Sequence, residues 1–494
     1  AAWEGKPMEV FVGRPESPES RPFGLSGAEV LAVAKSGEMA VSLNRYLVGG
    51  FRRTGTLAQL SVAGGAAPRD ILEEVEWADW SPDGKSLAIV RTARGQLRLE
   101  YPIGKVLYET SGWISHPRVS PDGDLVAFID HPVSGDDGGS VAAVDRSGKR
   151  RKLSGAFATA QGLAWSPGGE IWFTGAEVGG NRALYSTTPS GNVRQRVRIA
   201  GNLTLQDISR EGRLLVTRDT NRTEMLALAP GETRERDLTW LDWSLPAGIS
   251  ADGGLVLFSE GGEGGGAGYS VYIRKTDGSP AVRLGEGSAQ ALSPDGKWAL
   301  AITHIPADPQ LAAYPTGAGE PKTFPRDGLS VLGGVWLPGG KQILFTASEP
   351  GHGPRLYLRD VDGGKARALS PEGYVGIVVS PDGKAAVVTG PDRKYYLYPI
   401  AGGEPTPIPG IEITDGVDQF SADGRFLYVH RREAPLRVSR LDLATGRKEL
   451  WRTLMPSDAA GVSSLSPIPT PNGDAYVYNY VRTLSDLYIV EGLK

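Results

Sequence analysis

The sequence contains no cysteine, and this absence removes several kinds of chemistry. Disulfide bonds, thiolate zinc sites and a cysteine nucleophile are excluded, although the compartment is not fixed. No apolar run approaches the roughly 18 residues of a membrane-spanning helix, so no span is predicted. The chain opens with Ala-Ala-Trp, without an initiator methionine or a signal peptide, and we expect it to be a piece of something longer or a trimmed product.

An excess of positive charge is also missing. The formal net charge is −4, so neither a nucleic acid nor an anionic membrane surface is indicated as a partner. Glycine (67 residues) and proline (36 residues) are abundant, yet 40% of the residues are hydrophobic. This combination is typical of many short strands joined by many turns, and not of a disordered chain.

One short motif recurs along the whole chain. Its clearest copy is WSPDGK at residues 80–85, followed by an apolar run at residues 87–90. Full and looser copies end at eleven anchor glycines: Gly37, Gly84, Gly123, Gly169, Gly212, Gly253, Gly296, Gly340, Gly383, Gly424 and Gly473. Their spacing of roughly 39 to 49 residues is typical of a propeller or another repeat array.

Each copy of the motif predicts a tight turn between two strands. Pro82 presets φ for the second position of a type I turn, Asp83 tolerates the third, and Gly84 can adopt φ > 0. An alternative interpretation of Asp83 or Asp122 is a catalytic acid or metal ligand, but aspartate is an ordinary turn former. The glycines of the five clearest copies, which we expect to be structural, are Gly84, Gly123, Gly169, Gly296 and Gly383.

A second hairpin follows each anchor by about 10 to 25 residues. Residues 355–359 and 367–369, joined by a glycine-containing turn, are an example. Four strands in about 43 residues make one propeller blade, a four-stranded antiparallel sheet. The fold class predicted is therefore an all-β propeller.

The number of blades follows from counting both hairpins. A second hairpin occurs once before any anchor, at residues 8–23, so we expect the first blade to lack its two inner strands. Residues 486–490 are expected to form the third strand of the last repeat. The total is about twelve blades, or eleven if the two terminal pieces share one blade.

Most propellers have about four to eight blades, so twelve predict two six-bladed propellers in tandem. We place them at residues 1–243 and 244–494, with one large ring as the alternative. The boundary is chosen near Trp240, Trp243 and Pro246, which suit either an inter-domain seam or the packing between ordinary blades.

The starts of the innermost strands face the central channel of a propeller. His116 is the most distinctive residue at such a start. The candidate channel-lining residues are Trp77, His116, Gln161, Thr204, Ser288, Tyr374 and Asp415. A ring of this kind suits a small ligand, a peptide or an ion. The alternative is a water-filled funnel whose polar groups satisfy one another.

Two loops between a second and a third strand exceed the repeat pattern, at residues 134–140 and 259–268. Their acidic candidates at the channel mouth are Asp136, Asp137, Glu260 and Glu263. Long loops on a rigid scaffold often bind partners, although flexible spacers are an equal alternative.

Catalytic motifs are not found. There is no Gly-x-Ser-x-Gly elbow and no Asp-Phe-Gly, and the histidines share no metal-ligand spacing. Gly84-Lys85-Ser86 resembles the end of a phosphate-binding loop, but it follows a hairpin turn and precedes no helix. We therefore expect no catalytic, cofactor-binding or metal-binding residue, no cofactor, and no enzyme activity.

The repeated SPDGK hairpin and its apolar strand resemble the repeat of TolB-type, WD-like β-propellers, over essentially the whole chain. A narrower resemblance is carried by residues 14–21, 77–88 and 485–494. These segments are similar to the C-terminal sensor region of bacterial membrane-anchored serine/threonine protein kinases. In that family a kinase domain and a membrane helix precede an extracytoplasmic propeller. This chain contains neither, and no catalytic residue carries over.

The narrower resemblance implies a non-catalytic sensor on the outer side of a bacterial membrane. It would bind a small ligand, a peptide or an envelope protein at the channel mouth, and it would meet the membrane only through an upstream helix. One alternative is a free-standing TolB-like envelope scaffold for protein–protein interaction. Another is a propeller enzyme, a peptidase or lyase, with a site at the channel mouth.

Overall fold

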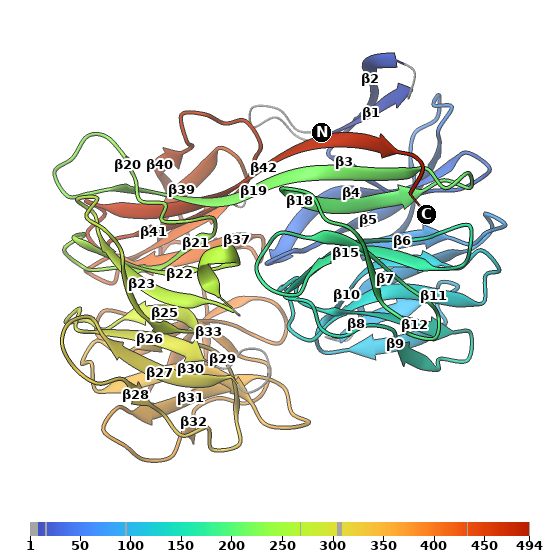
Figure 1. Cartoon of the computed structure of the whole chain (residues 1–494). Helices are drawn as coiled ribbons and strands as arrows, with labels where there is room; N and C mark the ends of the chain where they lie inside the picture. The colour runs from blue at the N-terminus through green and yellow to red at the C-terminus, as the bar shows by residue number, and fades with distance from the viewer. Residues whose placement is uncertain are drawn as a thin grey trace. The chain divides into compact units, whose positions relative to one another are not determined.

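The computed structural model describes residues 8–14, 17–93, 96–266, 268–303, 309–431 and 433–493, and strands dominate these residues (Figure 1). Most strands form antiparallel sheets of four in chain order. The described residues contain one short 3-10 helix, η1 (Gly262–Gly265). The β-propeller fold predicted from the sequence is confirmed. In the described ranges no helix has the length and apolar character needed to cross a membrane.

The contacts divide the chain into two compact units. Unit 1 consists of residues 1–221 and 483–494, and unit 2 consists of residues 222–482. The chain passes from one unit to the other within β19 (Leu214–Leu228) and returns within β42 (Tyr476–Val490). The boundary placed from the sequence, between residues 243 and 244, differs because the division falls inside two continuous strands.

Unit 2 contains five sheets that each follow the chain without interruption. They are β21 (Ser244–Ile249), β22 (Leu255–Glu260), β23 (Ser270–Lys275) and β24 (Val282–Glu286); β25 (Ser288–Leu292), β26 (Trp298–Thr303), β27 (Gln310–Pro315) and β28 (Lys322–Thr323); β29 (Ser330–Trp336), β30 (Gln342–Ser348), β31 (Arg355–Asp360) and β32 (Arg367–Ala368); β33 (Val375–Val379), β34 (Ala385–Thr389), β35 (Tyr395–Pro399) and β36 (Thr406–Pro407); and β37 (Asp415–Phe420), β38 (Phe426–Arg431), β39 (Leu436–Asp442) and β40 (Lys448–Leu454).

A further sheet of unit 2 is built from two distant parts of the chain. Its strands are β41 (Val462–Pro469), the first half of β42, the second half of β19 and β20 (Arg236–Asp237). The first strands of the sheets touch in the order β21, β25, β29, β33, β37 and β41, and β41 touches β21. The first strands therefore form a closed ring and lie innermost.

Unit 1 begins with a separate hairpin and a seven-stranded sheet. The hairpin is β1 (Glu9–Arg14) and β2 (Ser17–Ser26), and the sheet comprises β3 (Ala28–Val33), β4 (Glu38–Gly49), β5 (Arg52–Ser61), β6 (Arg69–Trp80), β7 (Leu87–Ala93), β8 (Gln96–Glu100) and β9 (Val106–Thr110). The long strand β6 pairs with β5 through its first half and with β7 through its second half. It thus ends one four-stranded blade and begins the next.

Two regular sheets and one shared sheet complete unit 1. The regular sheets are β10 (Trp113–Val119), β11 (Leu125–His131), β12 (Ser140–Asp145) and β13 (Arg150–Lys152); and β14 (Thr159–Trp165), β15 (Ile171–Ala176), β16 (Ala183–Thr187) and β17 (Arg194–Val197). The shared sheet contains β18 (Asn202–Ile208), the first half of β19 and the second half of β42. The total of twelve blades stays a prediction.

The structure corrects the place of residues 486–490. They belong to β42, but they do not complete the sheet of the last repeat. The Ser485 hydroxyl donates to the Asp219 carboxylate of β19 at 2.7 Å, and Val490 packs beside Leu205 and Val216. The second half of β42 is therefore the third strand of the repeat anchored at Gly212, while β19 supplies the third strand of the repeat anchored at Gly473.

The anchor turns join the first strand of a sheet to the second. In the copy at Gly84, whose φ is 68°, the Gly84 N–H donates to the Ser81 carbonyl at 2.8 Å. The Ser81 hydroxyl donates to the Asp83 carboxylate at 2.6 Å and holds the pKa of that carboxyl below its usual range. The aspartate is thus a turn former, as predicted. The same serine–aspartate bond recurs at Ser120–Asp122, Ser250–Asp252, Ser293–Asp295, Ser380–Asp382 and Ser421–Asp423.

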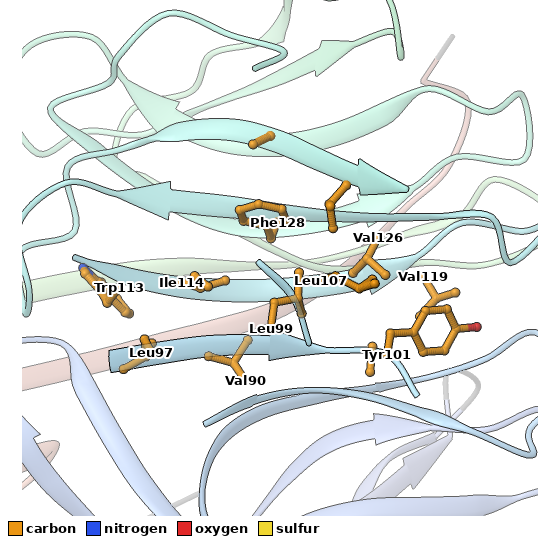
Figure 2. Close-up of a cluster of buried hydrophobic side chains, with 13 residues drawn as sticks. Val90, Leu97, Leu99, Tyr101, Leu107, Trp113, Ile114, Val119, Val126 and Phe128 are labelled. Atoms are coloured by element: carbon orange, nitrogen blue, oxygen red, sulfur yellow. The ribbon is translucent and has the colours of Figure 1, made fainter. Parts of the chain in front are cut away.

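The hydrophobic core lies between consecutive blades. Figure 2 shows one such cluster, in which Leu97 and Leu99 of β8 lie near Ile114 of β10 and Phe128 of β11. All four side chains are almost completely buried. Because both faces of a blade are apolar, each blade is stabilised by the two neighbours that cover it.

Two anchor glycines allow the strain of the turn to be separated from crowding. Replacing Gly296 by alanine is expected to cost about 1 kcal/mol, because φ is 70° but no heavy atom lies within 4 Å of the added Cβ. Replacing Gly253 by alanine is expected to cost about 2 kcal/mol or more, because its Cβ would lie 2.7 Å from Ala475 Cβ and Pro230 Cγ. Urea unfolding of both variants measures the difference, and equal losses would contradict the account.

The shared sheet of unit 2 is held by a carboxylate. Glu235 accepts hydrogen bonds from the Tyr476 and Tyr478 hydroxyls at 2.7 and 3.0 Å, and both tyrosines are buried. Replacing Glu235 by alanine leaves two phenols without this acceptor, so we expect a loss of about 1–2 kcal/mol in urea unfolding. The control is Glu232→Ala, which removes an exposed carboxylate nearby and is expected to change stability by less than about 0.5 kcal/mol.

Candidate functional site

Three first strands of unit 1 bring charged side chains together. They are Asp79 of β6, Arg118 of β10 and Asp207 of β18, and we call them the charged layer. Each of them stands five positions before an anchor glycine in the sequence. The first strands of this unit touch in the order β6, β10, β14 and β18. An Arg118 amino group nevertheless reaches past β14 and donates to the Gln206 carbonyl at 3.2 Å. The charged layer therefore lies on the inner face of the unit 1 strands.

Asp79 is desolvated and has no close counter-charge. Its carboxylate accepts the Val119 N–H at 2.7 Å, and no basic nitrogen of the described residues lies within 4.0 Å of it. Burial raises the pKa of Asp79 to about 6; Arg118 opposes this shift and Asp207 adds to it. The guanidinium of Arg118 donates instead to the carbonyls of Pro117 and Gln206.

The corresponding positions of unit 2 carry no charge. Five residues before its anchor glycines stand Gly248, Ala291, Val335, Val378, Gln419 and Ile468. The first strands of both units pair antiparallel with the strand that follows them, and within the described ranges those in both units carry a β-bulge before the anchor turn. The charged layer is therefore a property of unit 1 and is not required by the fold.

His116 lies beside the charged layer, at the bulge of β10, with a positive φ of 49°. Its ring lies 4.2 Å from the ring of Trp77, which is on the same face of β6 as Asp79 because the two are two residues apart. The pKa of His116 is held well below its usual value by burial, and Arg118 lowers it further. Both effects favour the neutral form of His116.

A hydrogen-bonded chain sets the protonation of His116. The Gly138 carbonyl lies 3.1 Å from His131 Nδ1, and a carbonyl can only accept, so His131 carries its proton there. The Ser115 hydroxyl then donates to His131 Nε2 at 2.8 Å and accepts from His116 Nδ1 at 2.9 Å. This leaves His116 Nε2 as an acceptor, without a hydrogen-bond partner in the described part of the chain.

The loop at residues 134–140 is held by hydrogen bonds from other elements of unit 1. The Phe51 N–H donates to the Gly135 carbonyl at 2.9 Å, and a Cβ on Gly50 would lie 1.9 Å from that oxygen. The Trp113 indole donates to the Asp136 carbonyl at 2.5 Å. These bonds tie the loop to the β4–β5 turn and to β10, and the choice between a binding loop and a spacer stays a prediction.

Asp137 of this loop joins two predicted channel residues in a buried network. Its carboxylate accepts from Gln161 at 2.7 Å and lies 3.9 Å from Arg182. Arg182 donates to the Thr204 hydroxyl at 2.9 Å and lies 3.6 Å from the Asp219 carboxylate. Burial raises the pKa of Asp137 and lowers that of Arg182. The polar groups of this network therefore bond to one another, as expected for the alternative in which the channel is a water-filled funnel.

The predicted residues of unit 2 are mostly engaged in packing and ion pairs. Asp415 is buried and pairs with Lys448 at 2.6 Å. Tyr374 packs edge-on against Tyr398, with the ring centres 5.4 Å apart. Ser288 begins β25 and pairs with Ile302. The structure does not gather these three into one cluster.

The acidic candidates of the second long loop also have structural places. Glu260 is fully buried and accepts from the Trp243 N–H and the Ser244 hydroxyl, both at 2.8 Å. Burial raises its pKa. Glu263 belongs to η1, and its side chain lies outside the described residues.

Two exposed apolar side chains lie on neighbouring first strands of unit 2. Leu332 of β29 is 57% exposed, and Val375 at the start of β33 is 37% exposed. The two strands are in contact. Val282, which is 56% exposed, lies instead on the outer strand β24.

The sequence analysis selected the residues at the starts of the first strands. This selection included His116 and Trp77 but did not include the charged layer. Asp79, Arg118 and Asp207 share one signal: each lies at the same number of residues before an anchor glycine. An alignment of the repeats on those glycines would have shown it. Arg182 and Asp219 carry no such signal.

No family model matches the chain, and no curated protein matches it. A putative TolB from Agrobacterium tumefaciens is similar in structure, with 19% identity and a TM-score of 0.40, over 53% of this chain and 99% of that chain. TolB from Acinetobacter baumannii shows 13% identity and a TM-score of 0.27, over 83% of this chain and 82% of that chain. The propeller domain of the Trilobed protease from Pyrococcus furiosus shows 13% identity and a TM-score of 0.28, over 70% and 95%. These likenesses concern the fold alone.

Replacing Asp79 by asparagine is expected to stabilise the protein at pH 7.5 by about 1–3 kcal/mol. The folded pKa of about 6 is above the ordinary value of 3.8, so ionised Asp79 costs stability, increasingly as the pH rises from about 4 to 6 and fully above that. Asparagine removes this charge and keeps an acceptor for Val119. Urea unfolding at pH 4.5 and 7.5 is the measurement, with the exposed Asp124→Asn as control. A difference that does not grow with pH would contradict the assignment.

Proposed function

We propose that this chain is a non-catalytic binding propeller whose partner is a protein of the cell envelope. The observation that carries the proposal is the exposure of Leu332 and Val375 on adjacent first strands of unit 2. Apolar side chains exposed on adjacent strands are a surface that a protein partner would cover. The fold and the TolB-type repeat are consistent with such a scaffold.

The fixed loop at residues 134–140 supports recognition in a second way. Its backbone is held by groups from the β4–β5 turn, β10 and β14, including the bond from the Ala160 N–H to the Asp137 carbonyl at 2.9 Å. A loop already ordered in the free protein loses less conformational entropy when it binds.

The hydrogen-bonded Ser115–His131 pair is not suited to nucleophilic catalysis. Both residues are 0% exposed, so a substrate carbonyl has no path to the hydroxyl. Burial also lowers the pKa of His131 to about 3, which makes it a weak base at neutral pH.

The finer form of the proposal is the sensor region of a receptor-like serine/threonine kinase, outside the cytoplasm. A ligand of such a sensor acts only if it binds one signalling state more tightly than the other. The alternative is a free-standing TolB-like scaffold. The coding sequence upstream of Ala1 separates them: a kinase domain and a membrane helix support the sensor, and a signal peptide alone supports the scaffold.

A propeller enzyme is the second candidate, and one observation favours it. Asp79, with a pKa of about 6, and the neutral His116 are perturbed groups on one inner face. Turnover of a peptide or polysaccharide library that is lost in His116→Ala, while the fold is kept, would establish the enzyme and overturn the binding proposal.

The binding proposal is tested with matched surface variants. Immobilised wild-type protein is expected to enrich a defined set of envelope proteins, and Leu332→Asp with Val375→Asp is expected to reduce that enrichment by about tenfold. Val282→Asp places the same charge at an equally exposed apolar position on an outer strand and is expected to leave the enrichment unchanged. Quantitative mass spectrometry gives the ratios. Equal enrichment by all three proteins would sink the proposal.

A further inference from the structure

The last sheet of unit 1 ends on a strand with a free edge. Its strands are β18, the first half of β19 and then residues 483–490 of β42, which are its third strand. The regular blades continue with a fourth strand, as β32 follows β31. β42 pairs only with β19 and β41 among the described strands, and its register with β41 stops at Arg482. The place of a fourth strand beside residues 483–490 is therefore open in the described part of the chain.

The side chains of this third strand are exposed, in contrast to those of a matched strand. Residues 356–358 of β31 read LYL and are 0%, 3% and 6% exposed, because β32 and apolar clusters on both faces cover them. Residues 487–489 of β42 read LYI and are 63%, 45% and 45% exposed. The second half of β42 thus has the sequence of a covered third strand but is not covered.

The free edge also lacks the residues that discourage strands from pairing. Several outermost strands of other blades present basic residues or proline, as in Arg150–Lys152, Lys322–Thr323 and Thr406–Pro407. Residues 484–490 contain no lysine, arginine or proline, and Asp486 is their one charged residue. An exposed strand edge of this kind offers backbone N–H and C=O groups to another strand. A further β-strand is therefore the partner that this edge fits.

The segment is complementary to itself in an antiparallel arrangement centred on Leu487. The opposed pairs are Leu487 with Leu487, Asp486 with Tyr488, Ser485 with Ile489 and Leu484 with Val490. This register opposes no two like charges and brings apolar side chains of the two copies together. Because the same residues serve on both sides, the contact closes as a two-fold dimer and does not continue into a fibre.

We propose that residues 484–490 pair antiparallel with the same segment of a second copy of this chain, so that the two sheets continue as one. The self-complementary register is what favours a second copy as the occupant. A contact through a single strand is small, so we expect a reversible dimer with a Kd on the order of 10 µM. This inference is independent of the apolar contact proposed for unit 2, because the two surfaces share no residue.

Sedimentation velocity from about 1 to 300 µM, on both sides of the expected Kd, tests the proposal. The wild-type chain is expected to change from monomer to dimer over this range. Leu487→Lys opposes two ammonium groups in the dimer and is expected to raise the Kd by about tenfold or more. Val282→Lys, the same change at an exposed apolar residue of an outer strand, is expected to leave the Kd unchanged. A chain that stays monomeric throughout, or a dimer unaffected by Leu487→Lys, would overturn the proposal.

A charge-reversal pair tests the register. Leu487→Lys and Leu487→Asp each oppose like charges when alone, but a mixture of the two opposes an ammonium and a carboxylate. We therefore expect the mixture to dimerise about tenfold more tightly than either variant alone. A mixture that associates as weakly as its components would refute the pairing through Leu487.

Hydrogen exchange separates strand pairing from other kinds of association. In the wild type, amides of residues 484–490 are expected to exchange more slowly at about 300 µM than at about 5 µM, and Leu487→Lys is expected to remove this difference. Protection that appears in another segment instead would place the dimer contact elsewhere. Protection of residues 484–490 at every concentration would mean that another part of the same chain covers the edge. Either of these two results would overturn the proposal.

Discussion

A propeller blade is apolar on both faces, and it is stable only when a neighbour covers each face. The buried clusters between consecutive blades, such as the one formed by β8, β10 and β11, are the result of that constraint. The ring of unit 2 satisfies it by bringing β41 against β21, so that no blade of that unit is left with an open face. The anchor turns serve the same end, because each returns the chain to the sheet and carries it to the next blade.

Closing the ring determines how the chain ends are used. The last sheet of unit 2 takes its inner strands from the end of the chain and its outer strands from residues 222–237, and the Glu235 bonds to Tyr476 and Tyr478 join these two parts. Unit 2 is nevertheless one continuous segment, whereas unit 1 needs residues 483–490 for its third strand beside β19. Such a pairing has a very large sequence separation, so we expect unit 1 to be completed late in folding.

The local parts of this fold were predictable from the sequence, and the long-range parts were not. Proline, aspartate and glycine at fixed positions identify turns such as that at Gly84, and alternating apolar residues identify the strands on each side. The exchange of third strands between the two repeats cannot be predicted from these patterns. Apolar and polar residues alternate along a strand in the same way whichever strand it pairs with. Residues 486–490 were recognised as a third strand and assigned to the wrong repeat for this reason.

The candidate site was only partly predictable for a related reason. Counting from strand starts identifies Trp77 and His116, but a bulge in the first strand changes which face each later residue occupies. Arg182 and Asp219, which complete the network around Gln161 and Thr204, come from a loop and a second strand. Only the folded chain brings them together.

The two units make the energetics of the charged layer unusually easy to interpret. They share turn chemistry, strand order and bulges, and in unit 2 the residues five positions before the anchor glycines are all uncharged. Unit 1 keeps a carboxylate, that of Asp79, whose pKa burial raises, while the Arg118 guanidinium donates to carbonyl groups. A side chain that lowers stability and makes no compensating contact is characteristic of a functional site. Natural proteins keep locally unfavourable residues mainly where function requires them.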